Sequence, residues 1–183
     1  ATSGAATGDV WLPVREQGEL WRIDRDSNRV TAKIKTGPDP ERRVTAFGSV
    51  WVTDPEDGTV TRVDPATGRV VQRIEIGPST LGIGATAAAL WVAVSHDGTL
   101  LKLDPRSGRV VATVHYGKPQ EDSAARVVAG PGDVWVQDGG ALTHVDASSA
   151  RVVSTLPLPG QPGRADGEVT LGGGSLWVVN TVG

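Results

Sequence analysis

The chain has 183 residues, of which 38% are hydrophobic and 21% charged, and its formal net charge is −3. This length is sufficient for one domain with a sizeable core. No apolar run approaches the roughly eighteen residues that span a membrane, so we expect no membrane insertion by this segment. The 18 basic residues are scattered among 21 acidic ones, which argues against nucleic acid as a partner.

The chain contains neither cysteine nor methionine. Without cysteine there is no disulfide framework, thiolate nucleophile or soft-metal site. The missing initiator methionine predicts that the chain begins inside a longer translation product, either after removal of a signal peptide or at a truncation point. We therefore expect an exported protein, located in the periplasm or outside the cell.

Five tryptophans recur in one local context, each flanked by aliphatic residues and separated by 40, 40, 44 and 42 positions. They are Trp11, Trp51, Trp91, Trp135 and Trp177. An aliphatic residue and then an aspartate follow in the first three units, nine and thirteen positions later; in the fourth unit both arrive two positions earlier. The repeat predicts one domain over 1–183 whose blades lie at about 1–37, 38–77, 78–117 and 118–160, with a partial blade at 161–183.

Each unit is expected to form four strands. The first is short, as in 43–46, and the second carries the tryptophan within an apolar run typical of a strand covered on both faces. The third is exemplified by 59–63. The fourth, over 70–76, alternates apolar and polar residues as a half-solvated outer strand does. Repeats of about forty residues with four strands predict an all-β fold, a β-propeller with four complete four-stranded blades and the start of a fifth.

Two of the turns between third and fourth strands, 64–68 and 104–108, read Asp-Pro-x-Thr/Ser-Gly. Gly68 and Gly108 occupy a position that needs positive φ, and Asn28 is the next-best residue there. Ala150 is a poor choice at this position, so we expect a distorted fourth turn. The aspartates should accept hydrogen bonds from the N–H groups of their turns. These aspartates are Asp24, Asp64, Asp104 and Asp146.

The motif G-x-[VL]-W-V, followed by a hairpin and [LV]-x-[RK]-[ILV]-D-P-x-[TS]-G-R-V-V, resembles a bacterial propeller superfamily. That superfamily includes YVTN-type surface-layer repeats, NHL repeats and the streptogramin (virginiamycin B) lyases. The resemblance covers essentially the whole chain and implies the propeller architecture. Because this superfamily mixes enzymes, sensor domains and adhesion modules, the resemblance does not select one function.

Two enzyme classes can be compared with the residues. The resemblance implies that a lyase would use histidines, carboxylates and magnesium on one propeller face. The segments that lead into the first strands contain no histidine; they are 40–43, 79–82, 122–125 and 164–167. Quinoproteins carry a tryptophan shortly after the Asp-turn, where this chain has 70–73. The sequence therefore predicts no catalytic residue, no cofactor and no metal site, and an enzyme is the less favoured class.

Two sets of recurring residues are interpreted as scaffold. The five tryptophans in register should fill the core between blades, whereas Trp21 is expected to pack near an edge. A basic residue stands two positions before each turn aspartate and should form an inter-strand ion pair beside it. This basic column is Arg22, Arg62, Lys102 and His144.

Binding residues are expected where the repeat breaks down, in the loops from fourth to first strands and the hairpins from second to third strands. The candidates are Arg42, Arg43, Asp57, His96, Asp97, Glu121, Asp122, Arg126 and Arg164. The alternative is a solvated rim of mixed charge.

The first functional hypothesis is a non-enzymatic sensor or binding module that recognises a protein or small molecule. The alternatives are a fragment of a lyase-like enzyme whose catalytic residues lie in missing blades, and a structural repeat of a surface protein.

The fifth unit stops after its tryptophan strand, at 175–179. We therefore expect that these residues do not form a self-contained closed propeller, because an open strand edge invites pairing. The open blades would be covered by self-association, by another polypeptide or by the remainder of a longer chain.

Overall fold

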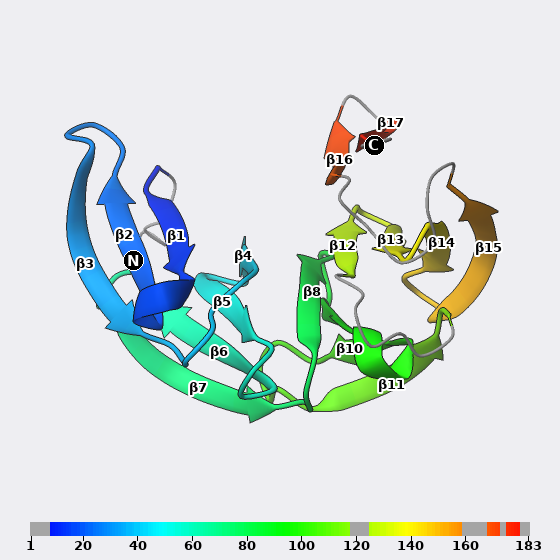
Figure 1. Cartoon of the computed structure of the whole chain (residues 1–183), viewed down its shortest axis with the longest axis horizontal. Helices are drawn as coiled ribbons and strands as arrows, with labels where there is room; N and C mark the ends of the chain where they lie inside the picture. The colour runs from blue at the N-terminus through cyan, green and yellow to red at the C-terminus, as the bar shows by residue number, and fades with distance from the viewer. Residues whose placement is uncertain (1–7, 118–124, 159–167, 173–174, 180–183) are drawn as a thin grey trace. The chain divides into compact units, whose positions relative to one another are not determined.

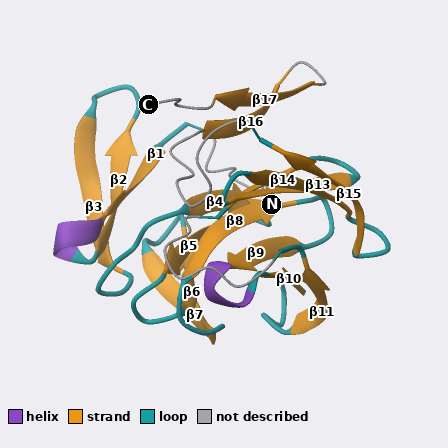
Figure 2. Ribbon diagram, turned by 45° about the vertical axis from the view of Figure 1, so that its right-hand side comes forward, coloured by secondary structure: helices purple, strands orange, loops and turns teal. Residues whose placement is uncertain are grey.

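A computed structural model describes residues 8–117, 125–158, 168–172 and 175–179. This part of the chain is all-β, with two three-residue 3-10 turns, η1 (Arg15–Gln17) and η2 (Ser95–Asp97) (Figure 2). The internal contacts divide the chain into two compact units, Ala1–Thr80 and Leu81–Gly183, which are described separately. Within the described ranges, no helix is long and apolar enough to cross a bilayer.

The first unit contains two antiparallel sheets in which strands follow one another in chain order (Figure 1). The first sheet comprises β1 (Val10–Val14), β2 (Glu19–Asp24) and β3 (Arg29–Lys35). The remaining strand of the predicted four would precede Val10, where residues 1–7 lie outside the described part. The second sheet comprises β4 (Arg43–Ala46), β5 (Ser49–Asp54), β6 (Thr59–Asp64) and β7 (Arg69–Glu75).

The second unit contains two four-stranded sheets and one two-stranded sheet. The third sheet comprises β8 (Thr80–Ala85), β9 (Leu90–Val94), β10 (Thr99–Leu103) and β11 (Val110–His115). The fourth comprises β12 (Arg126–Ala129), β13 (Asp133–Asp138), β14 (Ala141–Asp146) and β15 (Arg151–Pro157). The fifth comprises β16 (Glu168–Gly172) and β17 (Ser175–Val179). The predicted all-β propeller fold is confirmed, and the number of sheets fits the predicted blades, including the start of a fifth.

Consecutive sheets pack through the same positions in both units. Three residues of one blade pack on aliphatic residues of the next blade. They are the tryptophan, the aliphatic residue nine positions later and an aliphatic residue of the outer strand. In the first unit these are Trp11, Leu20 and Ile34 against Val50, Val52 and Val63. In the second they are Trp91, Leu100 and Val114 against Val134, Val136 and Val145. Within each unit, one blade therefore covers a face of the next.

Burial varies along the tryptophan column. Trp51 and Trp91 are fully buried and Trp11 is 2% exposed, which confirms them as core residues. Trp135 is half-buried. Trp177 is 62% exposed, so the prediction that it belongs to the core is wrong. The residues around Trp177 correctly predict a strand there, but they do not predict whether other residues cover its ring.

The basic column lies over the tryptophans. The Arg62 guanidinium carbon is 5.0 Å from the centre of the Trp51 ring, and the Lys102 nitrogen is 5.3 Å from that of Trp91. Arg22 forms an ion pair, but the predicted partner is wrong: its guanidinium lies 2.5 Å from the Asp9 carboxylate and not beside Asp24. Strand pairing explains this, since a side chain two positions before the turn also faces the beginning of the tryptophan strand.

The four Asp-turns have one shape. As predicted, the carboxylate of each aspartate accepts a hydrogen bond from a backbone N–H two or three positions later. The nitrogen-to-oxygen distances are 2.7 to 2.9 Å. Asn28, Gly68, Gly108 and Ala150 all have positive φ, at 53°, 66°, 73° and 53°. The Ala150 nitrogen donates to the Asp146 oxygen at 2.9 Å, as glycines do in the equivalent turns. The expected distortion is therefore wrong: the turn keeps its shape and Ala150 carries the strain.

Replacing Ala150 with glycine should relieve that strain. A left-handed residue with a Cβ costs about 1–2 kcal/mol, which is partly offset by the larger unfolded-state entropy of glycine. We expect Ala150→Gly to raise the melting temperature of the unit by roughly 2–4 °C. The matched control is Ala66→Gly, at a turn position without positive φ, which should lower it. A lower melting temperature for Ala150→Gly would contradict the strain.

The two ends of the tryptophan column should respond differently to truncation. Trp91→Ala leaves a cavity in a fully packed interface and should cost about 3–5 kcal/mol of unfolding free energy. Trp177→Ala removes an exposed ring and should cost less than about 1 kcal/mol. Chemical denaturation followed by circular dichroism measures both. Equal losses would show that Trp177 is packed in solution.

Candidate functional site

In the first unit, the predicted binding arginines already have partners within the chain. The Arg42 guanidinium lies 3.7 Å from the Glu41 carboxylate, and its backbone N–H donates to the Thr53 hydroxyl at 3.1 Å. The Arg43 Nε donates to the Trp11 carbonyl. These contacts tie the loop between β3 and β4 to the neighbouring strands.

The loop also carries an ion pair across the two sheets of this unit. Arg15, in η1, contacts Asp39 through two nitrogens at 2.6 and 2.7 Å. Hydrogen bonding to Asp39 is the largest cause of the raised pKa of Arg15. Asp54 is buried at the end of β5 and accepts backbone N–H groups from Asp39 and from exposed Asp57. Its carboxylate is therefore occupied by the chain itself.

In the second unit, the structure places three of the predicted residues at one end of the third and fourth sheets. His96 and Asp97 are exposed in η2, and Arg126 is half-buried at the start of β12. The backbone N–H of Ala125, the residue before Arg126, donates to the hydroxyl of Ser95 at 3.2 Å. Three further predicted residues, Glu121, Asp122 and Arg164, lie outside the described residues.

A buried hydrogen-bonded pair joins these two sheets at the same end. The Tyr116 hydroxyl donates to Asp138 Oδ2 at 2.7 Å, and Tyr116 also hydrogen-bonds the Ser95 side chain. Tyr116 is 8% exposed and Asp138 5%. Burial raises the pKa of the Asp138 carboxyl above its ordinary value, although the hydrogen bond from Tyr116 opposes that shift. Burial and the nearby carboxylate raise the pKa of Tyr116, which keeps its hydroxyl protonated.

One acceptor of this pair lacks a hydrogen-bond donor among the described residues. It is Asp138 Oδ1, on a residue that is 5% exposed. An unsatisfied buried polar group costs about 1–3 kcal/mol. Gln137 Oε1 also lacks a donor among these residues, but it lies on the other face of the sheet, because successive strand residues face opposite sides. We call Ser95, Tyr116 and Asp138 the acceptor cluster.

Asp138 was not predicted from the sequence, although a signal exists. It occupies the same repeat position as Asp54, three residues after the tryptophan. The hairpin after Asp54 has amides that bond its carboxylate, including that of Asp57. The hairpin after Asp138 is two residues, Gly139 and Gly140, both at positive φ. That shorter hairpin and the chain's single tyrosine are what set Asp138 apart.

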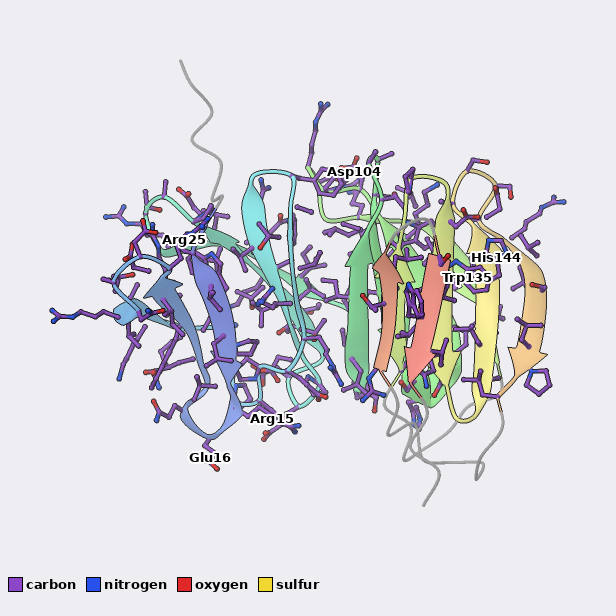
Figure 3. The ribbon with its side chains drawn as sticks, turned by 90° about the horizontal axis from the view of Figure 1, so that it is seen from above. Arg15, Glu16, Arg25, Asp104, Trp135 and His144 are labelled. Carbon is purple, nitrogen blue, oxygen red and sulfur yellow. The ribbon has the colours of Figure 1, made fainter. Side chains whose placement is uncertain are left out.

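A hollow of about 540 Å³ lies elsewhere in the second unit, between the fourth and fifth sheets. It is lined by Pro131, Asp133, Trp135, Leu171 and Leu176, among others. Trp135 stacks on His144, with ring centres 4.1 Å apart, and His144 Nε2 lies 2.6 Å from Asp133 (Figure 3). As with Arg22, the acid partner of His144 is not the turn aspartate. This is the basic column again, beside a loosely packed blade interface.

No family model and no curated protein matches the chain. Solved structures, however, do match it. A streptogramin B lyase has a TM-score of 0.77 at 18% identity over 94% of this chain and 58% of that one. The hydrazine synthase of Kuenenia stuttgartiensis has a TM-score of 0.68 at 16% identity over 84% and 47%. The glutaminyl cyclase of Myxococcus xanthus has a TM-score of 0.61 at 13% identity, over 83% of this chain and 67% of that one.

All three neighbours are β-propeller proteins. The chain has the β-propeller repeat fold. It spans about half to two thirds of the length of these propellers. At such low identity the likeness concerns the fold alone, so the more specific resemblance to YVTN and NHL repeats stays a prediction.

The raised pKa of Asp138 predicts how stability depends on pH. The folded state favours the protonated carboxyl, so the contribution of Asp138 is fully present below its ordinary pKa and is lost as pH rises through its folded-state pKa. Asp138→Asn keeps an acceptor for Tyr116 without the charge. The unfolding free energy of the wild type should therefore fall relative to this variant between pH 4 and 7, as measured in urea. A wild type that gains on the variant would contradict this.

Proposed function

We propose that this propeller chain is a non-enzymatic binding module that recognises its ligand at the acceptor cluster. The observation that carries the proposal is the buried acceptor Asp138 Oδ1, without a donor among the described residues. A ligand that presents an N–H donor, such as an ammonium, guanidinium or amide group, would satisfy it. The partner is therefore a small molecule or peptide with such a group.

The surroundings suit recognition better than proton transfer. Tyr116 keeps its proton and donates it to Asp138 in a hydrogen bond of 2.7 Å, so it orients the carboxylate. Arg126, His96 and Asp97 lie at the same end and would contact the outer part of the ligand. A carboxylate held against a desolvation cost gives a strong charge-assisted hydrogen bond once a donor arrives.

The lyase-like alternative is less favoured. Similarity to a streptogramin B lyase supports a shared fold and transfers no residue. Among the histidines, His144 is engaged by Trp135 and Asp133, away from the acceptor cluster. Export to the periplasm or the cell exterior belongs to this proposal as well, and its support is the resemblance to surface-layer repeats.

Separating binding from stability tests the proposed function. The probes are short peptides with lysine, arginine or a free amino terminus, titrated by nuclear magnetic resonance. Asp138→Asn should weaken binding by roughly tenfold or more, as loss of a buried charged partner does, while the melting temperature at pH 7 stays equal or rises. The matched control is Asp133→Asn, at the other end of β13, which should bind as the wild type does. No binding of any peptide at about 1 mM, or full binding by Asp138→Asn, would contradict the proposal.

A further inference from the structure

The Asp138 carboxylate lacks the backbone amides that bond its counterpart, Asp54. Two of those amides belong to the four-residue hairpin 55–58, whereas only two residues separate Asp138 from its strand partner Ala141. The third amide belongs to the loop between β3 and β4. Three N–H donors therefore reach Asp54, at 2.8 to 3.1 Å, from Asp39, Glu56 and Asp57.

The loop position that Asp39 holds in the first unit is a proline in the second. Asp39 stands two positions after Gly37, and Pro119 stands two positions after the equivalent Gly117. Pro119 lies outside the described residues, but a proline has no backbone N–H to donate in any conformation. The sequence has thus removed the donors that serve Asp54 and has kept the acceptor at Asp138, as a site for an external donor requires.

The Asp138 side chain also takes another direction than that of Asp54. Asp54 Oδ2 lies so close to Gly37 that a Cβ on this glycine would collide with it. A Cβ on Gly117 would have no described atom within 4 Å apart from its chain neighbours. The Asp138 carboxylate is instead turned to the Tyr116 hydroxyl. The place that the carboxylate takes in the first unit is therefore free of described side chains in the second, which leaves room for a small group.

A chain of hydrogen bonds fixes one of the two oxygens of Asp138. The Ala125 N–H donates to the Ser95 hydroxyl at 3.2 Å, and Ser95 hydrogen-bonds the Tyr116 hydroxyl. Because that hydroxyl gives its one proton to Asp138 Oδ2, at 2.7 Å, it accepts the bond from Ser95. Oδ2 therefore has a donor that is itself held in place, and Oδ1 is the oxygen open to a ligand.

Given the proposed function, on which this inference rests, we propose that the ligand group is a primary ammonium, such as a lysine side chain or an amino terminus, and that Tyr116 selects it over a guanidinium. A guanidinium binds a carboxylate most strongly as a fork, with one N–H on each oxygen. Tyr116 already holds Oδ2, so the fork cannot form without displacing its hydroxyl. An ammonium donates from one compact nitrogen and needs Oδ1 alone.

Two peptides that are acetylated and amidated at their ends, and that differ only in one lysine or arginine, test this selection. They are titrated against the full chain by nuclear magnetic resonance. The lysine peptide should bind the wild type roughly tenfold more tightly, because the arginine peptide forfeits one hydrogen bond of its fork. Tyr116→Phe frees Oδ2, so the two affinities should become similar. Ser95→Ala keeps the tyrosine hydroxyl but not its fixing donor, and should lower the ratio by less.

Thr143→Val is the matched control. Its hydroxyl donates to the Tyr116 carbonyl at 3.3 Å and not to the ring hydroxyl, so the variant should keep the wild-type ratio. Equal or tighter binding of the arginine peptide by the wild type, or a ratio that Tyr116→Phe leaves unchanged, would overturn the selection while the proposed binding site stands. Binding of neither peptide at about 1 mM would overturn both. The wild-type ratio decides by itself if Tyr116→Phe does not fold.

Discussion

The structure depends on one constraint: each four-stranded sheet has two apolar faces and has to be covered on both. Within each unit, the tryptophan of one blade is buried by the aliphatic residues that flank the tryptophan of the next. The rings are covered a second time by the basic column. Hydroxyls reinforce this packing, since Thr61 donates to the Thr36 carbonyl at 3.0 Å and Thr143 to that of Tyr116 at 3.3 Å. Repetition of one interface explains how a short motif specifies a large scaffold.

The same constraint accounts for the exceptions. Trp135 and Trp177 carry the motif of the buried tryptophans, but Trp135 lies beside the fifth sheet and Trp177 belongs to it. The described part of that sheet has two strands. The exposure of the two tryptophans rises in that order, and the hollow beside Trp135 lies at the same interface. The acceptor cluster is an exception of another kind. There, the third and fourth blades meet through a buried carboxyl in addition to their aliphatic contacts. Burying this group is costly unless a donor satisfies it.

Much of the fold could be predicted because it is repeated. The spacing of the tryptophans gave the blades, and the turn pattern gave positive φ at Asn28. Features of single blades could not be read in this way. The left-handed turn at Ala150 is imposed by its neighbours despite an unfavourable residue. The partner of Arg22 is set by cross-strand register rather than by sequence proximity, so Asp9 was missed. Burial of Trp177 depends on a neighbouring strand and not on its own context.

The candidate site was predicted less well, because charge in irregular loops was taken as the signal. In the first unit the arginines have partners within the chain, as Arg42 has in Glu41 and Arg43 in the Trp11 carbonyl. The more informative residue was Asp138, whose short glycine hairpin leaves its carboxylate without the amides that bond Asp54.

The central claim is that Asp138 is an acid held at an energetic cost for a ligand to use. Carbon-13 nuclear magnetic resonance of its side-chain carboxyl, titrated with pH, tests this most directly. The account predicts that the pKa of Asp138 lies above the ordinary aspartate value and falls when a peptide with an ammonium or guanidinium group binds. A pKa at or below the ordinary value, or one that such a bound peptide leaves unchanged, would contradict it.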